Sequence, residues 1–251
     1  MTLIPKGYRL GLYRSFVIYY HIPFRRWRMK RLYRHFIGSG ELAFDVGAHL
    51  GNRTRVLADL GADTVSFEPQ PACRGLLENW YGEDARIKLE FTALGAQAGQ
   101  TEMLLSSRHP TLASTDRAWV EDVGKTAEFQ GIQWDARHKI AVHTLNDMIS
   151  RYGMPAFIKI DAEGHEPAIL KGLSAPVKAV SFELLGQQRH RAIACIDRLE
   201  TLGTYRFNYS PGETMRLSLS HFVRADEMKA IVNSYSSGQR SADIYAILQN
   251  N

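Results

Sequence analysis

The chain has 251 residues, of which 45% are hydrophobic, and carries 31 Lys or Arg against 26 Asp or Glu. This length and apolar content predict one large α/β domain, with or without additions, and a sizeable core. No apolar run reaches the roughly 18 residues of a membrane-spanning helix. Arg14 interrupts the apolar stretch 10–20, and no small-residue cleavage site follows it, so the sequence predicts no signal peptide. We therefore expect a cytoplasmic protein.

The two cysteines, Cys73 and Cys195, lie far apart in the sequence and have no Cys or His neighbours at metal-ligand spacing. This pattern predicts reduced thiols with a structural role.

Positive charge is concentrated in residues 1–40, which contain nine Lys or Arg and no acid, whereas the rest of the chain has 22 bases against 26 acids. Nine aromatic residues interleave with these bases, which predicts one or two amphipathic helices broken near Pro23. Such helices could make peripheral membrane contact through residues 1–37 or grip a phosphate-bearing substrate. Alternatively, they cap the main domain, 41–251, with their aromatics and keep their arginines solvated.

Beyond this extension, strand and helix patterns alternate. Strands are predicted at 41–45, 64–67, 87–93, 101–106, 139–144, 156–160, 178–182, 205–209, 216–219 and 244–248. Helices are predicted at 52–60, 71–81, 145–152, after Asp161 up to Leu173, 188–202 and 225–235. Residues 107–135 form a polar excursion without a clear period. This order predicts a mostly parallel sheet finished by antiparallel strands.

A glycine-rich turn follows the first strand. Asp45, Gly47 and Gly51 form D-x-G-x-x-x-G, which lacks the middle glycine that dinucleotide binders use to admit a pyrophosphate. Glu68-Pro69 ends the second strand, where a carboxylate can bind ribose hydroxyls. S-adenosylmethionine needs only a short amide-lined loop and a carboxylate, so the pattern favours it over NAD. We expect Asp45 to organise the turn by accepting its backbone amides.

Acids also end two later strands, at Asp161 and Glu183. Methyl transfer to a hydroxyl requires a positioned acceptor that loses its proton. Asp161 is the first candidate for this role, and Glu163, His165 and Glu183 are reserves, although His165 could simply cap a helix. Clustered carboxylates could also hold a divalent metal, an alternative that the pattern does not favour, so no metal ligand is assigned. The stem of Lys159 is expected to pack, with its amine near a carboxylate.

The segments FDVGAHLGN, SFEPQP and FIKIDAEGHEPAILKGL, with HTLNDMI before the third and VSFELLG after it, resemble the FkbM family of S-adenosylmethionine-dependent methyltransferases. The resemblance covers residues 41–186. It implies a Rossmann-like class I methyltransferase fold, with a seven-stranded, mostly parallel sheet and an antiparallel closing strand. It also implies O-methylation of a hydroxyl on a sugar, glycan or secondary metabolite.

The resemblance is carried over position by position. The expected cofactor-binding residues are Asp45, Gly47, Ala48, His49, Gly51, Asn52, Glu68, Pro69, Ala93 and Asp161. His49 stands where the family often carries Asn, and both side chains can form hydrogen bonds. Asp161, Glu163 and Gly164 match the family's I-K-x-D-x-E-G motif.

Two other functions stay open. A nucleic-acid methyltransferase would place the basic arm on phosphates, but the strand end reads Asp161-Ala162-Glu163-Gly164 and not Asn/Asp-Pro-Pro-aromatic, so nucleic acid is not the expected partner. A non-catalytic Rossmann-like binding protein is the second, because fold does not fix function. The residues expected to choose a small-molecule or glycan acceptor lie in the N-terminal arm, in the loop 209–215 and at Arg108, His109, Trp119 and Trp134.

Overall fold

The computed structural model describes residues 24–106, 113–116, 120–121, 124, 131–236 and 241–249. The break predicted near Pro23 and the candidate acceptor residues Arg108, His109 and Trp119 lie outside these ranges. The strands are β1 Leu42–Val46, β2 Asp63–Phe67, β3 Ile87–Glu90, β4 Ala93–Leu94, β5 Gly99–Leu105, β6 Ala136–His143, β7 Phe157–Ile160, β8 Ala179–Leu184, β9 Tyr205–Pro211 and β10 Ala242–Leu248. The helices are α2 Arg25–Tyr33, α3 Asn52–Asp59, α4 Pro71–Tyr81, α6 Leu145–Tyr152, α7 Glu166–Lys171, the 3-10 turn η3 Gly186–Gln188, α8 Arg189–Leu202 and α9 Ala225–Ser234.

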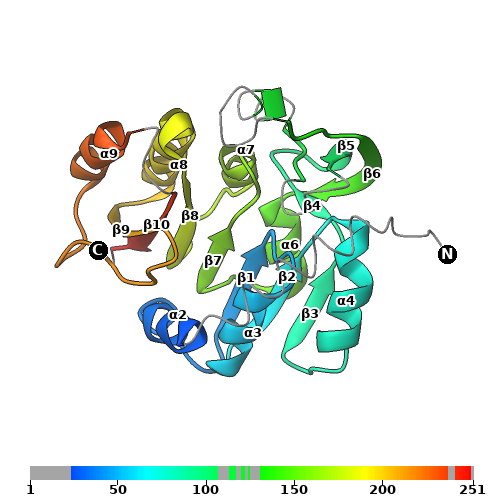
Figure 1. The fold of residues 1–251 in the computed structure, drawn as a ribbon. Helices are drawn as coiled ribbons and strands as arrows, with labels where there is room; N and C mark the ends of the chain where they lie inside the picture. The colour runs from blue at the N-terminus through cyan, green and yellow to red at the C-terminus, as the bar shows by residue number, and fades with distance from the viewer. Residues whose placement is uncertain are drawn as a thin grey trace.

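Seven strands form the main sheet in the order β3-β2-β1-β7-β8-β10-β9 (Figure 1). The neighbouring pairs from β3 to β8 are parallel, and β10 runs antiparallel to both β8 and β9. The predicted mostly parallel sheet with an antiparallel closing strand is confirmed. The strand order reverses at β1, because the chain first builds outward to β3 and then returns to place β7 on the other side. This reversal is where an open α/β sheet leaves a crevice for a ligand.

Two predicted strands differ in the structure. The strand predicted at 87–93 divides into β3 and β4, and β4 joins a separate three-stranded sheet with β6 and β5. The strand predicted at 216–219 is not formed. The backbone of this segment is bound by the side chain of Asn208, which donates to the carbonyl of Leu219 and accepts from the Leu219 amide at 3.0 Å. An amide side chain that satisfies a backbone segment in this way removes the need for a strand partner.

Helices cover both faces of the main sheet, with α2 and α3 on one side and α7, α8 and α9 on the other (Figure 1). Alternate residues of each strand serve these two layers: Phe44 and Ile158 pack in the cluster under α6–α9, whereas Ala43 and Phe157 pack with α2 and α3. The sequence therefore builds a doubly covered sheet, in which strands are apolar on both faces.

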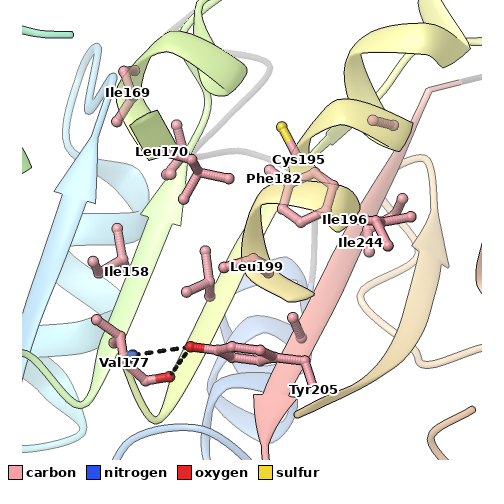
Figure 2. Packing of buried hydrophobic residues seen from close by; sticks show 14 of the residues in the cluster. Ile158, Ile169, Leu170, Val177, Phe182, Cys195, Ile196, Leu199, Tyr205 and Ile244 are labelled. Atoms are coloured by element: carbon pink, nitrogen blue, oxygen red, sulfur yellow. Dashed lines mark hydrogen bonds between the residues drawn. The ribbon is translucent and has the colours of Figure 1, made fainter. Parts of the chain in front are cut away.

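Figure 2 shows the larger of these cores, where Phe182 and Ile244 from the sheet meet Ile196 and Leu199 from α8. Each such side chain stabilises the fold by about 1.5–3 kcal/mol when buried. At the edge of this core, the Tyr205 hydroxyl accepts from the Val177 amide at 2.9 Å and donates to the Val177 carbonyl at 2.8 Å, so its polar atom is satisfied. The predicted structural role of Cys195 is confirmed here, and Cys73 is equally buried and free.

The basic helix α2 is joined to the sheet by aromatic packing. Phe36, just after the helix, stacks on Phe157 and Tyr245 with ring centroids 5.4 and 4.9 Å away. Arg25 is 2% exposed, so not every arginine of this helix is solvated. Phe24 and Trp27, in contrast, are 79% and 58% exposed. In the described part of the chain, no helix is both long and apolar enough to cross a membrane.

Candidate functional site

A pocket opens beyond the carboxyl ends of β1, β2 and β7, at the reversal of strand order. Eight of the ten expected cofactor residues line it: Gly47, Ala48, His49, Asn52, Glu68, Pro69, Ala93 and Asp161. Two of the reserve catalytic residues, Glu163 and His165, line it as well. The structure thus brings these residues from four separate segments to one cavity. Asp45, Gly51 and Glu183 lie outside its lining.

The turn after β1 is held tightly against both neighbouring strands. The amides of Gly47 and Ala48 donate to the carbonyl of Phe67 at 3.0 and 3.1 Å. Gly47 has φ +76°, and a Cβ on it would overlap the carbonyl oxygen of Asp161. A glycine is required at this position because the end of β7 passes directly beside it, a reason that the glycine pattern alone does not contain.

Asp45 does not accept the amides of this turn, contrary to our expectation. It is fully buried, and its Oδ2 accepts from the Thr54 hydroxyl at 2.6 Å. The turn amides instead go to Phe67 and to Glu68, which accepts from the His49 amide. Asp45 therefore ties β1 to helix α3 from beneath the turn.

Glu68 is a buried carboxylate with a defined place in the pocket wall. Its Oε2 accepts from the His49 amide at 2.7 Å and its Oε1 from the Gln70 amide at 2.8 Å. Burial raises the pKa of Glu68 to about 7, and the two amides offset only part of this effect. Each oxygen keeps a second lone pair for a further donor.

The first turn of α3 supplies the next part of the wall. Asn52 Oδ1 accepts from the Arg53 amide at 2.8 Å, while Nδ2 is buried and has no partner among the described residues. Burial lowers the pKa of His49 to about 4, so its imidazole is neutral at neutral pH. Gly51 begins the helix with φ +71°, and a Cβ there would lie 2.5 Å from the ring of Tyr81. Gly51 therefore serves packing behind the pocket.

Asp161 lies opposite Glu68, at the end of β7. Its Oδ2 is 2.5 Å from Lys159 Nζ and 3.9 Å from Arg53 Nη2. Burial raises the pKa of Asp161, but Lys159 and Arg53 together outweigh burial and hold it below its usual value. Lys159 is 1% exposed, which confirms the prediction of a packed stem and an amine beside a carboxylate.

The loop after Asp161 is fixed by hydrogen bonds to its backbone. Glu166 accepts from the amides of Ala162 and Gly164 at 2.9 and 3.3 Å. Ser114 donates to the carbonyl of Glu163 at 2.9 Å, where the backbone has a φ of +48°. The loop thus holds a strained conformation at the pocket.

The two side chains that this loop presents to the pocket both have a pKa shifted toward the uncharged form. His165 immediately precedes α7, and burial lowers its pKa. Burial, and after it the charge of Asp161, raises the pKa of Glu163 well above its usual value. The pKa shifts of His165 and Glu163 therefore both favour the uncharged form, whereas Lys159 and Arg53 favour the ionised form of Asp161.

A second group of acids lies behind the pocket. Glu183 on β8 is opposite Asp243 on β10 in the strand register, and burial raises the pKa of both. Arg53 Nη2 is 4.0 Å from Asp243 Oδ2 and 3.8 Å from Glu213 Oε1. Within the described residues, no group of three or more His, Cys, Asp or Glu has the arrangement of a metal site.

Sequence reasoning did not assign Arg53, Gln70 or Ser114 to the site. Gln70 stands in the run Glu-Pro-Gln-Pro, whose position after β2 could have indicated it. Arg53 and Ser114 gave no such signal, because their roles come from segments that meet only in the fold. Of the proposed acceptor residues that the structure describes, Trp134 does not line the pocket, while the loop 209–215 approaches it through Glu213.

Fold and site together define a class I S-adenosylmethionine-dependent methyltransferase. A family model described as the methyltransferase FkbM domain matches residues 45–210. The chain therefore belongs to the FkbM methyltransferase family. The predicted resemblance is confirmed.

No curated protein matches the chain. Among solved structures, a putative O-methyltransferase from Klebsiella pneumoniae is 9% identical with a TM-score of 0.47, covering 96% of this chain and 90% of its own. The O-methyltransferase from Bacillus cereus in complex with SAH is 11% identical with a TM-score of 0.45, covering 99% and 94%. A TehB-like SAM-dependent methyltransferase from Corynebacterium glutamicum ATCC 13032 Kitasato is 10% identical with a TM-score of 0.45, covering 96% of both chains. Likenesses this distant carry no argument about the acceptor.

Proposed function

We propose that the protein transfers the methyl group of S-adenosylmethionine to a hydroxyl of a sugar, glycan or secondary metabolite. The observation that carries this proposal is the placement of Asp161, an ionised carboxylate beside Lys159, in the same pocket as Glu68. An ionised carboxylate accepts a hydrogen bond from a hydroxyl and so can orient it for reaction.

The donor half of the pocket fits the nucleoside and amino-acid parts of S-adenosylmethionine. The remaining lone pairs of Glu68 suit the two ribose hydroxyls. The unpartnered Nδ2 of Asn52 suits a carboxylate. Pro69 and Ala93 provide apolar surface for a base. When bound, this cofactor supplies an electrophilic methyl group on a positively charged sulfur.

In the acceptor half of the pocket, one residue orients the acceptor hydroxyl and another takes its proton. Because its pKa is held low, Asp161 is a weak base, and its role is to orient the acceptor hydroxyl. His165 lines the same pocket, and its neutral imidazole can take the proton at neutral pH. Burial raises the pKa of Glu163 and so favours its uncharged form, which can donate or accept a hydrogen bond.

Isothermal titration with S-adenosylmethionine and S-adenosylhomocysteine tests the donor site. We expect Glu68→Ala to weaken binding about 10- to 100-fold, because the hydrogen bonds that its two oxygens offer to the ribose hydroxyls are lost. Glu83→Ala, at an exposed glutamate, is the matched control and should bind as the wild type does. Failure of the folded wild type to bind either compound would overturn the proposal.

Methyl transfer to a hydroxyl is tested with isotope-labelled S-adenosylmethionine and pools of hydroxylated sugars and metabolites. The product should show a methoxy signal by NMR. A label found on nitrogen or on duplex DNA or RNA would support the nucleic-acid methyltransferase instead. Cofactor binding without turnover of any acceptor would support the non-catalytic binding protein.

A further inference from the structure

The outer side of α2 carries an unusual combination of exposed aromatic and basic side chains. We call it the α2 outer face, and it consists of Phe24, Arg26, Trp27, Arg31 and Arg34, all of them exposed. The opposite side of the helix is buried against the sheet through Met29, Leu32 and Tyr33. Packing therefore fixes which side chains face outward.

The aromatic pair on this face is not explained by packing within the protein. Phe24 and Trp27 are the two most exposed among the four large hydrophobic side chains that the described residues expose. Phe24 is the residue immediately before α2, and Trp27 lies in the first turn, so both rings stand at the start of the helix. The guanidinium of Arg31 is 5.8 Å from the ring centroid of Trp27. Scattered exposed hydrophobics are normal, but an adjacent pair beside arginines indicates an interaction surface.

The charge of the face is also largely uncompensated. Arg26 pairs with Asp59, but Arg31 and Arg34 have no acidic partner in the described part of the chain. Residues 1–23, which join the helix at Phe24, add three bases and five aromatics and no acid. The partner is therefore expected to be anionic and able to accept aromatic rings.

We propose that the α2 outer face docks on an anionic lipid surface. Aromatic side chains prefer the interface between headgroups and hydrocarbon, and arginines are attracted to anionic headgroups. Nucleic acid would also attract the arginines, but phosphate contacts alone do not call for two exposed rings at the helix start.

Only some of residues 1–37 can contact a lipid surface, because others are buried in the structure. Tyr33, Phe36 and Ile37 are at most 3% exposed and belong to the core beneath α2. On the inner side of the helix, Arg25 Nη2 is 2.6 Å from Glu213 Oε2. Glu213 in turn reaches Arg53 in the pocket wall, so the start of α2 is fixed at the edge of the pocket.

Vesicle co-sedimentation of the full chain tests the proposal. We expect sedimentation with equimolar phosphatidylcholine and phosphatidylglycerol vesicles, and none with phosphatidylcholine alone. Phe24→Ser with Trp27→Ser, and separately Arg31→Glu with Arg34→Glu, should each weaken sedimentation about tenfold or more. Raising the salt concentration should weaken it further.

Matched controls separate docking from other effects. Trp80→Ser on α4 removes an exposed ring, and Arg137→Glu on β6 reverses an exposed charge, and both should sediment as the wild type does. Cofactor titration and thermal melting check that each variant is folded. If the wild type does not bind S-adenosylmethionine, thermal melting alone provides this check. Unchanged sedimentation of the two double variants, or tighter binding to duplex RNA than to anionic vesicles, would overturn the proposal.

Discussion

The two sides of the strand reversal place carboxylates at the pocket by opposite means. On the β2 side, Glu68 is held by two backbone amides, and burial raises its pKa to about 7. On the β7 side, Asp161 is held by Lys159 and Arg53, which keep its pKa below the usual value. Amides fix the position of a carboxylate, whereas buried cations also fix its charge.

Because one pKa is raised and the other is lowered, the two carboxyl groups change the stability of the fold with pH in opposite directions. The folded-state pKa of Glu68 is raised, so its contribution is present at low pH and is lost as pH rises from about 4.5 to about 7. The folded-state pKa of Asp161 is lowered, so its contribution is present above its usual pKa of 3.8 and is lost as pH falls below it. The pocket therefore combines a carboxyl group that titrates near neutral pH with one that stays ionised.

The largest expected effect comes from the residue where the two sides touch. Gly47→Ala would drive a Cβ into the Asp161 carbonyl at φ +76°. We expect a loss of about 3 kcal/mol or more in the free energy of unfolding, since both overpacking and a left-handed backbone are penalised. Urea denaturation measures it.

Gly75→Ala is the matched control for this change. Gly75 lies within α4, and a Cβ there would meet nothing within 4 Å. This variant should be more stable than the wild type by about 0.5–1 kcal/mol. If Gly47→Ala were as stable as Gly75→Ala, the direct contact between the ends of β1 and β7 would be contradicted.

Glu68→Gln sharpens the comparison on the β2 side. The variant removes a group whose burial costs about 3 kcal/mol once it is ionised, by the size of its pKa change. Its stability relative to the wild type should therefore increase as pH rises through the range from about 4.5 to about 7. Urea denaturation across this range measures the difference. Parallel pH profiles for the two proteins would show that Glu68 does not titrate there.

Lys159→Met breaks the comparison on the β7 side. Removal of this buried cation leaves Asp161 with only Arg53, so we expect a loss of about 2 kcal/mol in the free energy of unfolding and a rise in the pKa of Asp161. The double variant with Asp161→Asn should recover part of the loss, because no unpaired charge is left. Chemical denaturation of both, with NMR titration of the Asp161 carboxyl, gives the two quantities.

Lys178→Met is the control, because its ion pair with Glu41 is exposed and should contribute less than about 1 kcal/mol. Equal losses for Lys159→Met and Lys178→Met would contradict a special role for the buried pair.

The sequence by itself determined the order of most elements, the carboxyl ends of the central parallel strands and many of the residues that meet at the pocket. Asp161 and Glu68 could be predicted because parallel strands bring their carboxyl ends to one edge, whatever the rest of the chain does. The family followed from motifs around these same strand ends, which are local in the sequence. The prediction of a strand at 216–219 was wrong, because an alternating pattern cannot show that the side chain of Asn208, several residues earlier, forms the hydrogen bonds of this backbone.

Only the tertiary structure decided the electrostatics of the site and the reasons for its glycines. The charge of Asp161 depends on Lys159 and on Arg53 from helix α3, and the pKa of Glu68 depends on how deeply it is buried. Gly47 is required by a carbonyl more than one hundred residues away in the sequence. Burial and contacts between distant segments set these properties, and neither is encoded in the spacing of residues along one strand.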